Sequence, residues 1–378
     1  MNIDKVQSTP SVALADTARS LKAAGVAVIE LQTGDPDFAT HPAIVEAAHK
    51  ALRDGMTHYS FSAGLPSLRA AIARSLNDEY ALRLEADHVL VTHGAAQGMS
   101  SVFSGLVELG DEVIVLEPNW TTVDSMVALA GGVTVKVSHL HDDVTLFDEL
   151  EKAFSSRTRI LCFNSPNNPT GTVFSADRVR RLVDWATARG VIVVSDEVYR
   201  SLVYQGRAAS VLEHFPGRDN VVFVDSFSKK YAMTGWRCGY VVAPRTLLGR
   251  IAKASQVAIT HVAPFVQAAA LEALNNASVA EAVKHMVEDY AARRAHLLDC
   301  CRKLQLDVVE PDGAFYLFIR LDADDVEFAK KLLDVRRVCA VPGSAYGATG
   351  RGWLRVTYAA PTNHVEEGLR AIASVRDG

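Results

Sequence analysis

The sequence predicts an α/β protein with a mostly parallel central sheet that helices cover. Strand-like and helix-like segments alternate over about 180 residues from residue 88 onward, as they do where helices connect parallel strands. The run from Val191 to Val194 is apolar throughout, which is typical of a central strand buried on both faces. Polar loops follow several of these strands, and such sheets bind ligands at the carboxyl ends of their strands. We therefore expect one functional site along that edge of the sheet.

The part of the chain before residue 88 is predicted to be mainly helical. The elements expected there are helices over 11–24, over 43–54 and from Pro66 onward, a strand over 26–31, a turn at 34–38 and a loop at 59–64. Pro42 opens the second helix and Gly55 ends it, because proline suits the first helical turn and glycine suits the residue after the last.

From residue 88 the expected strands are short apolar runs that end in polar or glycine-containing loops. They cover 88–92, 112–116, 133–137, 159–163, 191–194, 221–224 and 239–243. The helices between them are expected after the loop 93–98 to about 109, after Trp120, over 145–155 and over 176–189. Ser175 caps the last of these helices and Gly190 ends it.

A smaller α/β section is expected toward the C-terminus. The chain reads as helical from Pro264 to about 303, with a break near Asn275 and Asn276. Strands are then expected near Val308 and over 315–320, 338–341 and 353–358, with helices over 325–333 and 363–374.

Composition and charge exclude several classes of protein. The net charge of −5 offers no basic face for nucleic acid and no polybasic membrane patch. The most apolar stretch, 257–274, contains polar residues and a proline, which argues against a membrane span. The twelve histidines show no paired ligand spacing, so we predict no metal. The five cysteines are odd in number and lack a CxxC spacing, and no secretory signal is evident, which predicts a cytoplasmic protein.

The strongest chemical signal is the stretch from Asp225 to Arg237, which lies between two predicted strands. A lysine there, Lys229, is costly unless it is paired, neutral or covalently used. Ser226, Ser228 and Arg237 surround it and suit a dianionic phosphate, because they offer hydroxyls and a rigid fork of donors. A lysine that forms a Schiff base beside a phosphate site predicts pyridoxal 5′-phosphate. The alternative is a surface loop that happens to contain these residue types.

Other predicted strand ends supply what this cofactor needs. Asp196 can keep the ring nitrogen protonated, and Trp120 can provide an aromatic platform for the ring. Tyr199 and Asn168 can hydrogen-bond the ring hydroxyl. Arg355 is the candidate for the substrate carboxylate, because its guanidinium binds carboxylates with two hydrogen bonds. The alternatives are a helix or turn cap for Asp196, a core aromatic for Trp120 and a surface ion pair for Arg355.

Taken in order, the motifs of the chain form a specific set. They are Gly34-Asp35-Pro36-Asp37-Phe38, Tyr59 with Gly64 and Leu68-Arg69, Asn167-Asn168-Pro169-Thr170-Gly171, Asp196-Glu197-Val198-Tyr199, Ser226-Phe227-Ser228-Lys229 and Gly235-Trp236-Arg237. With these motifs the chain resembles the class I and II aminotransferases. These are pyridoxal phosphate enzymes of fold type I, the fold of aspartate aminotransferase. The motifs run from near the start to Arg355, so the resemblance covers essentially the whole chain.

The resemblance implies a role for each matching residue. Lys229 would form the Schiff base and move a proton between the substrate α-carbon and the cofactor C4′ carbon. Asp196 would pair with the ring nitrogen, and Tyr199 and Asn168 would contact the ring oxygen. The residues implied around the phosphate are Ala95, Ala96, Ser226, Ser228 and Arg237.

The resemblance also implies how substrate and subunits are arranged. Arg355, Asn168 and the Gly34 backbone would hold the substrate carboxylate. Tyr59 would reach the phosphate of a neighbouring subunit, which implies a homodimer with shared active sites. A large cofactor-binding domain over 41–275 and a small domain from 1–40 and 276–378 would follow from the family fold.

Two departures from the family pattern bear on these roles. Lys230 follows Lys229 where relatives carry a small residue or threonine, so two lysines compete for the Schiff base. We choose Lys229 because it keeps the Ser-x-Ser-Lys order and the family spacing to Arg237. Ala95 and Ala96 offer only backbone amides, so the serines and the arginine would carry more of the phosphate binding. Such amides at a helix N-terminus can approach an anion, although a plain strand-to-helix turn explains the same loop.

The leading hypothesis is an aminotransferase that moves an amino group from an L-amino acid to a 2-oxo acid by a ping-pong route. A carbon–sulfur β-lyase, or another elimination, decarboxylation or oxidation on the same fold, is the alternative, because one fold hosts many reactions. A non-catalytic regulator ranks lower, since an intact set of buried ionisable groups is hard to explain without chemistry. The sequence does not identify the amino acid. Gln32, His58 and His261 are candidates for its pocket, with core or surface roles as the alternative.

Overall fold

A computed structural model describes residues 10–377. The helices are α1 (Pro10–Ala23), α2 (Pro42–Arg53), α3 (Pro66–Tyr80), α4 (Gly94–Leu106), α5 (Thr122–Leu129), α6 (Asp143–Ala153), α7 (Ala176–Ala188), α8 (Phe227–Lys230), α9 (Arg245–Ile259), α10 (Pro264–Asn275), α11 (Ala277–Lys303), α12 (Asp325–Arg336) and α13 (Thr362–Arg376). The strands are β1 (Ile29–Glu30), β2 (Val89–Thr92), β3 (Glu112–Glu117), β4 (Val133–Ser138), β5 (Thr158–Asn164), β6 (Ile192–Asp196), β7 (Val221–Ser226), β8 (Gly239–Val242), β9 (Val308–Val309), β10 (Tyr316–Arg320), β11 (Val338–Cys339), β12 (Val341–Pro342) and β13 (Trp353–Thr357).

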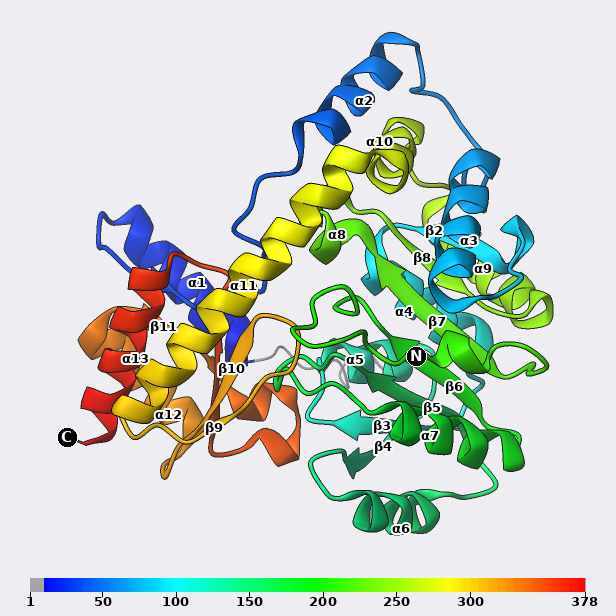
Figure 1. Cartoon of the computed structure of the whole chain (residues 1–378). Coiled ribbons are helices and arrows are strands. Elements are labelled where there is room, and N and C mark those ends of the chain that lie inside the picture. The colour runs from blue at the N-terminus through cyan, green and yellow to red at the C-terminus, as the bar shows by residue number, and fades with distance from the viewer. Residues whose placement is uncertain (1–9, 378) are drawn as a thin grey trace.

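The central sheet has seven strands in the order β2-β8-β7-β6-β5-β3-β4 (Figure 1). Strand β8 is antiparallel to both of its neighbours, and the other pairs are parallel. The mostly parallel sheet that the sequence predicts is therefore confirmed. Because β3, β5, β6 and β7 run parallel to one another, their carboxyl ends all lie at one edge of the sheet.

Helices cover both faces of this sheet, and the strand residues alternate between the two cores. Val193 and Val221 belong to the cluster that includes side chains of α3, α6 and α7. Val194 and Val222 belong to the opposite cluster, with side chains of α4 and α9. All four valines are fully buried, and each contributes roughly 1.5 to 3 kcal/mol by leaving water. The apolar run in the sequence is thus explained by burial on both faces.

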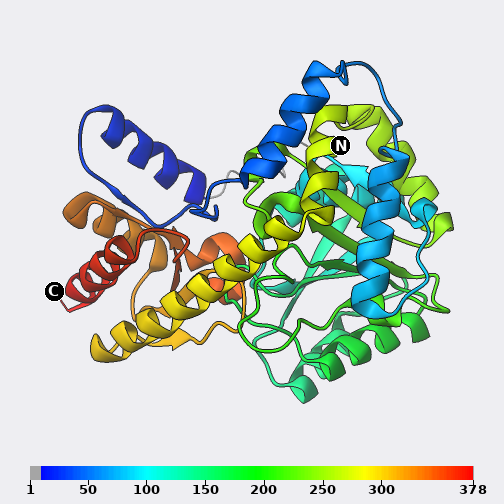
Figure 2. The same cartoon turned by 45° about the horizontal axis from the view of Figure 1, so that its top comes forward.

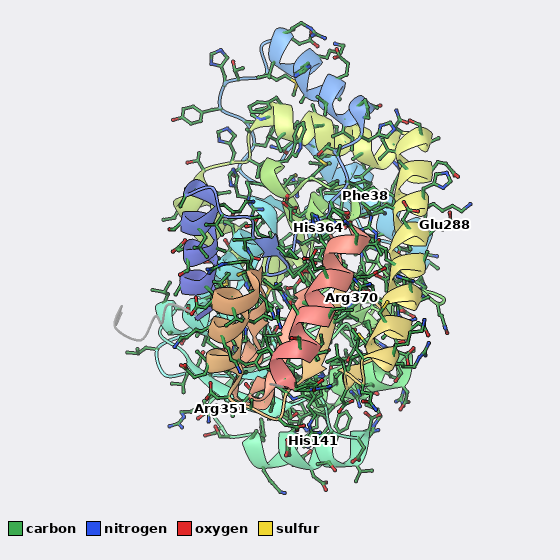
Figure 3. All side chains as sticks on the ribbon, turned by 90° about the vertical axis from the view of Figure 1, so that its left-hand side faces the viewer. Phe38, His141, Glu288, Arg351, His364 and Arg370 are labelled. Atoms are coloured by element: carbon green, nitrogen blue, oxygen red, sulfur yellow. The ribbon has the colours of Figure 1, made fainter. Side chains whose placement is uncertain are left out.

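A second unit contains β9 to β13 and the helices α1, α12 and α13, and it lies beside the central sheet (Figure 2). The long helix α11 runs from one unit to the other (Figure 1). Val279, near its start, packs in the core of the central sheet, whereas Tyr290 and Leu297 pack in the core of the second unit. On the outer side, α13 lies between α11 and α12 (Figure 3). The domain boundaries at residues 40/41 and 275/276 stay a prediction, and residues 1–9 of the predicted small domain lie outside the described residues.

The structure differs from several expected elements. The strand expected over 26–31 is reduced to Ile29–Glu30, which pairs with β11. The strand expected over 338–341 divides into β11 and β12, which belong to different sheets. Helix α9 was not anticipated, and the segment expected as a loop after β2 is already helical from Gly94. Helix α6 begins at Asp143 because the Asp142 carboxylate caps it, accepting hydrogen bonds from the amides of Val144 and Thr145.

None of the helices within residues 10–377 combines the length and the apolar character that a membrane crossing requires.

Candidate active site

A cavity of about 380 Å³ opens where the central strands end, between the sheet and the second unit. Its walls contain all the predicted site residues except Tyr59. These are Gly34, Ala95, Ala96, Trp120, Asn168, Asp196, Tyr199, Ser226, Ser228, Lys229, Arg237 and Arg355. Residues from the ends of β2, β3, β5, β6 and β7 meet there, as expected for ligand sites in parallel sheets.

The Lys229 amine reaches into this cavity from the short helix α8, directly after β7. Its Nζ donates a hydrogen bond to the backbone oxygen of Gly34 at 2.5 Å. Burial, together with the nearby cations Arg355 and Arg237, lowers the pKa of Lys229 to about 8, while Asp35 and Asp196 oppose the shift. A fraction of the amine is therefore neutral near physiological pH, as a nucleophilic lysine requires.

Lys230, the competing lysine, lies elsewhere. It is not among the described residues that line the cavity, and its Nζ lies 5.2 Å from the centre of the Tyr231 ring. Consecutive residues of a helix point about 100° apart, so only one of the two neighbouring lysines can face the cavity. The geometry favours Lys229.

Asp196 ends β6 and is buried at the wall of the cavity. Burial raises the pKa of its carboxyl to about 7, and the neighbouring carboxylate of Asp225 adds to the shift. Its Oδ1 accepts a hydrogen bond from the amide of Val198 at 3.3 Å. Among the described residues it has no ion-pair partner within 4 Å, so a cationic ligand atom would relieve the cost of burying its charge.

A further group of residues in the cavity lining suits an anion. The amides of Ala95 and Ala96 lie in the first turn of α4, where backbone N–H groups lack helical partners. A side chain on Gly94 would come within 2.7 Å of the Arg237 guanidinium, so glycine lets the arginine approach the helix terminus. Ser226 and Ser228 line the same cavity with their neighbour Lys229. Backbone amides, hydroxyls and a guanidinium are groups that suit a phosphate.

Arg355 extends from β13 of the second unit and is buried. Its Nη1 donates to Asn168 Oδ1 at 3.3 Å, and its Nη2 donates to the backbone oxygen of Gln32. Its Nε is buried without a partner among the described residues. The guanidinium lies 4.5 Å from the ring centre of Tyr316 and 5.5 Å from that of Tyr346. A buried guanidinium with unused donors suits a carboxylate ligand.

Several residues of the cavity were missed from the sequence. Tyr316 shares a hydrogen bond with Tyr199 between their hydroxyls at 2.7 Å, and burial raises the pKa of both phenols. Tyr346 also lines the cavity. No local signal in the sequence pointed to Tyr316. It shares a face with Arg355 because Phe318, two residues further along β10, pairs with Arg355 in the folded sheet.

A buried ion pair holds the loop that follows β6, and the sequence analysis did not predict it. Arg200 follows Tyr199, and its Nε donates to Asp225 Oδ2 at 2.7 Å. The Tyr240 hydroxyl donates to the same oxygen at 2.9 Å. Asp225 directly precedes Ser226, so these hydrogen bonds hold the loop after β6 against the end of β7.

Tyr59 is not brought to the cavity. Its side chain is 89% exposed, and its ring meets the edge of His261 at 5.6 Å. His58 is exposed, whereas Gln32 lines the cavity. The expected contact of Tyr59 with a neighbouring subunit stays a prediction.

The donor set of the cavity fits pyridoxal 5′-phosphate. It offers an amine for the aldehyde, a buried carboxyl for the ring nitrogen and an arginine with two hydroxyls for the phosphate. Arg355 adds a buried guanidinium to the same lining, and such a group suits a carboxylate.

A second cluster lies outside this cavity, between α11 and α13. Donor atoms of His296, Cys300 and Glu366 lie within 4.8 Å of one another, and His296 Nε2 is 2.6 Å from Glu366 Oε1. The His296–Cys300 spacing of one helical turn was overlooked in the sequence, where we predicted no metal. That expectation stays a prediction.

The comparisons with known proteins agree with this arrangement. The model of the family described as "Aminotransferase class I and II" matches residues 26–372. The probable aspartate/prephenate aminotransferase of Aquifex aeolicus is 36% identical over 382 residues, which cover 98% of this chain and 96% of that protein.

Solved structures agree over the same range. The aspartate aminotransferase of Thermotoga maritima has a TM-score of 0.94 at 33% identity and covers 100% of this chain and 99% of its own. The aromatic aminotransferase of Pyrococcus horikoshii has a TM-score of 0.88 at 34% identity and covers 96% of this chain and 98% of its own. These likenesses extend over nearly the whole chain.

Proposed function

This chain belongs to the class I and II aminotransferase family, whose members use pyridoxal 5′-phosphate, and from that premise we propose how it transfers an amino group. The observation that carries the proposal is the Lys229 amine, held in one cavity with Asp196 and Arg355. The amino group would pass from an L-amino acid to the enzyme in a first half-reaction and to a 2-oxo acid in a second. The amino acid and the 2-oxo acid would bind in the same cavity, one after the other.

We assign the cofactor-binding residues by the donors that line the cavity. Asp196 would pair with the ring nitrogen, Trp120 would stack on the ring, and Tyr199 and Asn168 would hydrogen-bond its hydroxyl oxygen. The residues proposed to hold the phosphate are Ala95, Ala96, Ser226, Ser228 and Arg237. Pyridoxal phosphate, when bound, supplies an aldehyde that captures amines and an electron-accepting ring.

Lys229 would serve as both the anchoring amine and the acid–base group. Its lowered pKa leaves a neutral Nζ that can take the proton from the substrate α-carbon. The same nitrogen would then deliver that proton to the C4′ carbon of the cofactor, and it would move a proton in the opposite direction in the second half-reaction. Asp35 and Asp196 keep the pKa from falling further, so the protonated form also stays accessible near neutral pH.

Arg355 would fix the substrate through its α-carboxylate, together with Asn168 and the Gly34 backbone. The hydrogen bond of Nη1 to Asn168 and the flanking ring of Tyr316 hold the guanidinium in place. A bidentate pair orients the α-carbon as well as binding it, because two parallel hydrogen bonds fix the plane of the carboxylate.

We also propose a homodimer, in which the exposed Tyr59 reaches the phosphate held by the partner subunit. Its hydroxyl lies on a side chain that is 89% exposed and outside the cavity of its own chain.

The five cysteines are free thiols, which supports a cytoplasmic location because such thiols persist in reducing compartments.

The test follows both half-reactions separately. Adding amino acids alone to the purified holoenzyme is expected to convert its absorbance band stoichiometrically and release one 2-oxo acid per site. A 2-oxo acid should then restore the band. Recovery of the band without an oxo acid, accompanied by ammonia, would instead favour the elimination or oxidation alternative, and absence of any chromophore would favour a non-catalytic protein.

Replacing Asp196 with asparagine is expected to separate two properties of this residue. One is the free-energy cost of burying its charge, and the other is its proposed role in binding the cofactor. Its folded-state pKa of about 7 lies above the ordinary value of 3.8, so the folded protein binds more protons than the unfolded chain between these pH values. Its contribution to the free energy of unfolding therefore falls as the pH rises through that window. We expect cofactor-free Asp196→Asn protein to be about 4 kcal/mol more stable than the parent at pH 8, with little difference at pH 4.

The measurement is denaturant unfolding of both cofactor-free proteins at the two pH values, followed by cofactor titration at pH 8. Affinity for the cofactor or kcat should fall about 100-fold in the variant, because the ring nitrogen loses its anionic partner. An equal stability difference at both pH values would mean that packing, and not charge, is responsible.

A further inference from the structure

Three side chains of different chemical type converge between α11 and α13, outside the active-site cavity. Their donor atoms, on His296, Cys300 and Glu366, lie within 4.8 Å of one another. Figure 3 shows the two helices side by side on the outer side of the second unit. None of the three residues is among the described residues that line the cavity, so the proposed amino transfer does not explain why they meet.

The two helices hold the three residues at fixed positions. His296 and Cys300 are four residues apart in α11, so they lie on one face of that helix, one turn apart. Their neighbours Leu297 and Cys301 are buried in the core of the second unit together with Val365 of α13. Packing in that core fixes how the helices lie against each other, and ligands carried by rigid elements are placed more precisely than ligands on loops.

The contacts of His296 distinguish an ion site from a catalytic relay. Its Nε2 lies 3.7 Å from Cys300 Sγ and 2.6 Å from Glu366 Oε1. In a relay of thiol, imidazole and carboxylate, the sulfur and the carboxylate contact opposite nitrogens of the ring. Here both face the same nitrogen, so the three donor atoms surround one point, which is the arrangement of ligands around an ion.

The distances are close to those around a tetrahedral zinc ion. With Zn–N and Zn–O bonds of about 2.0 to 2.2 Å and a Zn–S bond of about 2.3 Å, neighbouring ligand atoms lie about 3.4 to 3.6 Å apart. The distance of 3.7 Å between Cys300 Sγ and His296 Nε2 is close to this value. The hydrogen bond of 2.6 Å between His296 and Glu366 must open by about 0.8 Å, which small rotations of the Glu366 side chain supply.

Arg370, labelled on α13 in Figure 3, orients the third ligand. Its Nη2 donates to Glu366 Oε2 at 2.7 Å, which leaves Oε1 to face His296. Outer partners of this kind hold the ligands of metal sites in place. The charge of Arg370 repels a bound cation, but its side chain is 63% exposed, so water weakens the repulsion.

We propose that His296, Cys300 and Glu366 bind one Zn²⁺ ion, with water as the fourth ligand. Imidazole, thiolate and carboxylate are the groups that bind zinc in proteins. On binding, the Cys300 thiol releases its proton to solvent, and the neutral His296 ring coordinates through Nε2. The expectation of no metal rested on the spacing of histidine pairs, whereas this set has one ligand of each type.

The role of this ion is structural. It ties α13 to α11, the helix that runs from the central sheet to the second unit (Figure 1). Because an ion that binds only the folded chain stabilises it, the bound Zn²⁺ stabilises the second unit.

The test is a Zn²⁺ titration of the holoenzyme under reducing conditions, with a competing chelator to measure the affinity. We expect one Zn²⁺ per chain with a Kd of about 1 μM or below. Co²⁺ in its place should give the visible bands of a tetrahedral site, which lie at longer wavelengths than the absorbance of the cofactor. Absence of a stoichiometric site, or of these bands, would overturn the proposal.

His296→Gln and Cys300→Ser each remove one ligand, and His285→Gln is the matched control. His285 is an exposed histidine of the same helix, but carboxylates are its partners, Glu281 and Glu288, each at 3.3 Å. We expect each ligand variant to weaken Zn²⁺ binding at least about 100-fold, because loss of an outer partner alone costs about 10- to 100-fold. The control should keep the affinity within about twofold of the parent.

Thermal unfolding of the same proteins separates binding from folding. Without the ion, all four proteins should unfold at similar temperatures, because none of the replaced side chains is buried. Zn²⁺ should raise the unfolding temperature of the parent and of His285→Gln, but not that of the two ligand variants. Equal affinities or an equal rise in all four proteins would overturn the site, and the cluster would then be an ion pair of His296 with Glu366 beside a thiol.

Discussion

Replacing Lys229 with alanine is expected to lower kcat by about 1,000-fold or more, the largest effect of any single substitution proposed for this aminotransferase. The variant loses the amine that holds the cofactor and the base that removes the α-proton, and positioned acid–base groups contribute about 100- to 10,000-fold. The structure gives the reason for choosing this lysine. Its Nζ is in the cavity, 2.5 Å from the Gly34 oxygen, and burial lowers its pKa to about 8.

Lys230→Ala is the matched control, because it removes the neighbouring lysine of the same short helix. We expect this variant to keep kcat within about threefold of the parent, since Lys230 is not among the described residues that line the cavity. The direct measurement is borohydride treatment followed by peptide mapping of the labelled lysine. A cofactor adduct that persists in Lys229→Ala and disappears in Lys230→Ala would reverse the assignment.

The second large effect is expected at Arg355. Substitution by alanine removes the buried guanidinium proposed to hold the α-carboxylate, and truncating one partner of such a pair costs about 3 to 4 kcal/mol, or roughly 100- to 1,000-fold in kcat/KM. The loss should appear mainly in kcat/KM for amino acids. The cofactor absorbance should be retained, because Arg355 is not among the residues proposed to hold the phosphate or the ring.

Arg355→Lys serves as the matched control for charge. It keeps the cation but loses the planar fork, so we expect it to recover only part of the loss. A primary amine without a carboxylate provides the complementary control, because its slow reaction should be unaffected by either variant. If the amine lost as much as the amino acids, Arg355 would act on the cofactor and not on the substrate carboxylate.

Local patterns in the sequence were sufficient for the central sheet. The apolar runs at β6 and β7, together with the glycine and proline residues at helix ends, fixed the order of the elements because these signals act over a few residues. They were insufficient where a short strand depends on a distant partner. Strand β1 pairs with β11 across more than 300 residues, and the segment 338–341 divides between two sheets, which no local periodicity can reveal.

The same division holds for the site. The residue types around Lys229, Asp196 and Arg355 identified the chemistry from the sequence, because few roles need a lysine, serines and an arginine at that spacing. The partners that tune them came from far along the chain. Tyr316 meets Tyr199, and Arg200 meets Asp225, only because separate strands pack together.

The sequence by itself determined the fold class, the family and the candidate chemical groups, since hydrophobic period, turn residues and ordered motifs are local properties. Only the tertiary structure decided which of two adjacent lysines enters the cavity, how far burial shifts the pKa values of Lys229 and Asp196, and which charged residues line the cavity. Each of these depends on the removal of water and on the distances between charges, and both quantities arise only when remote segments are packed against one another.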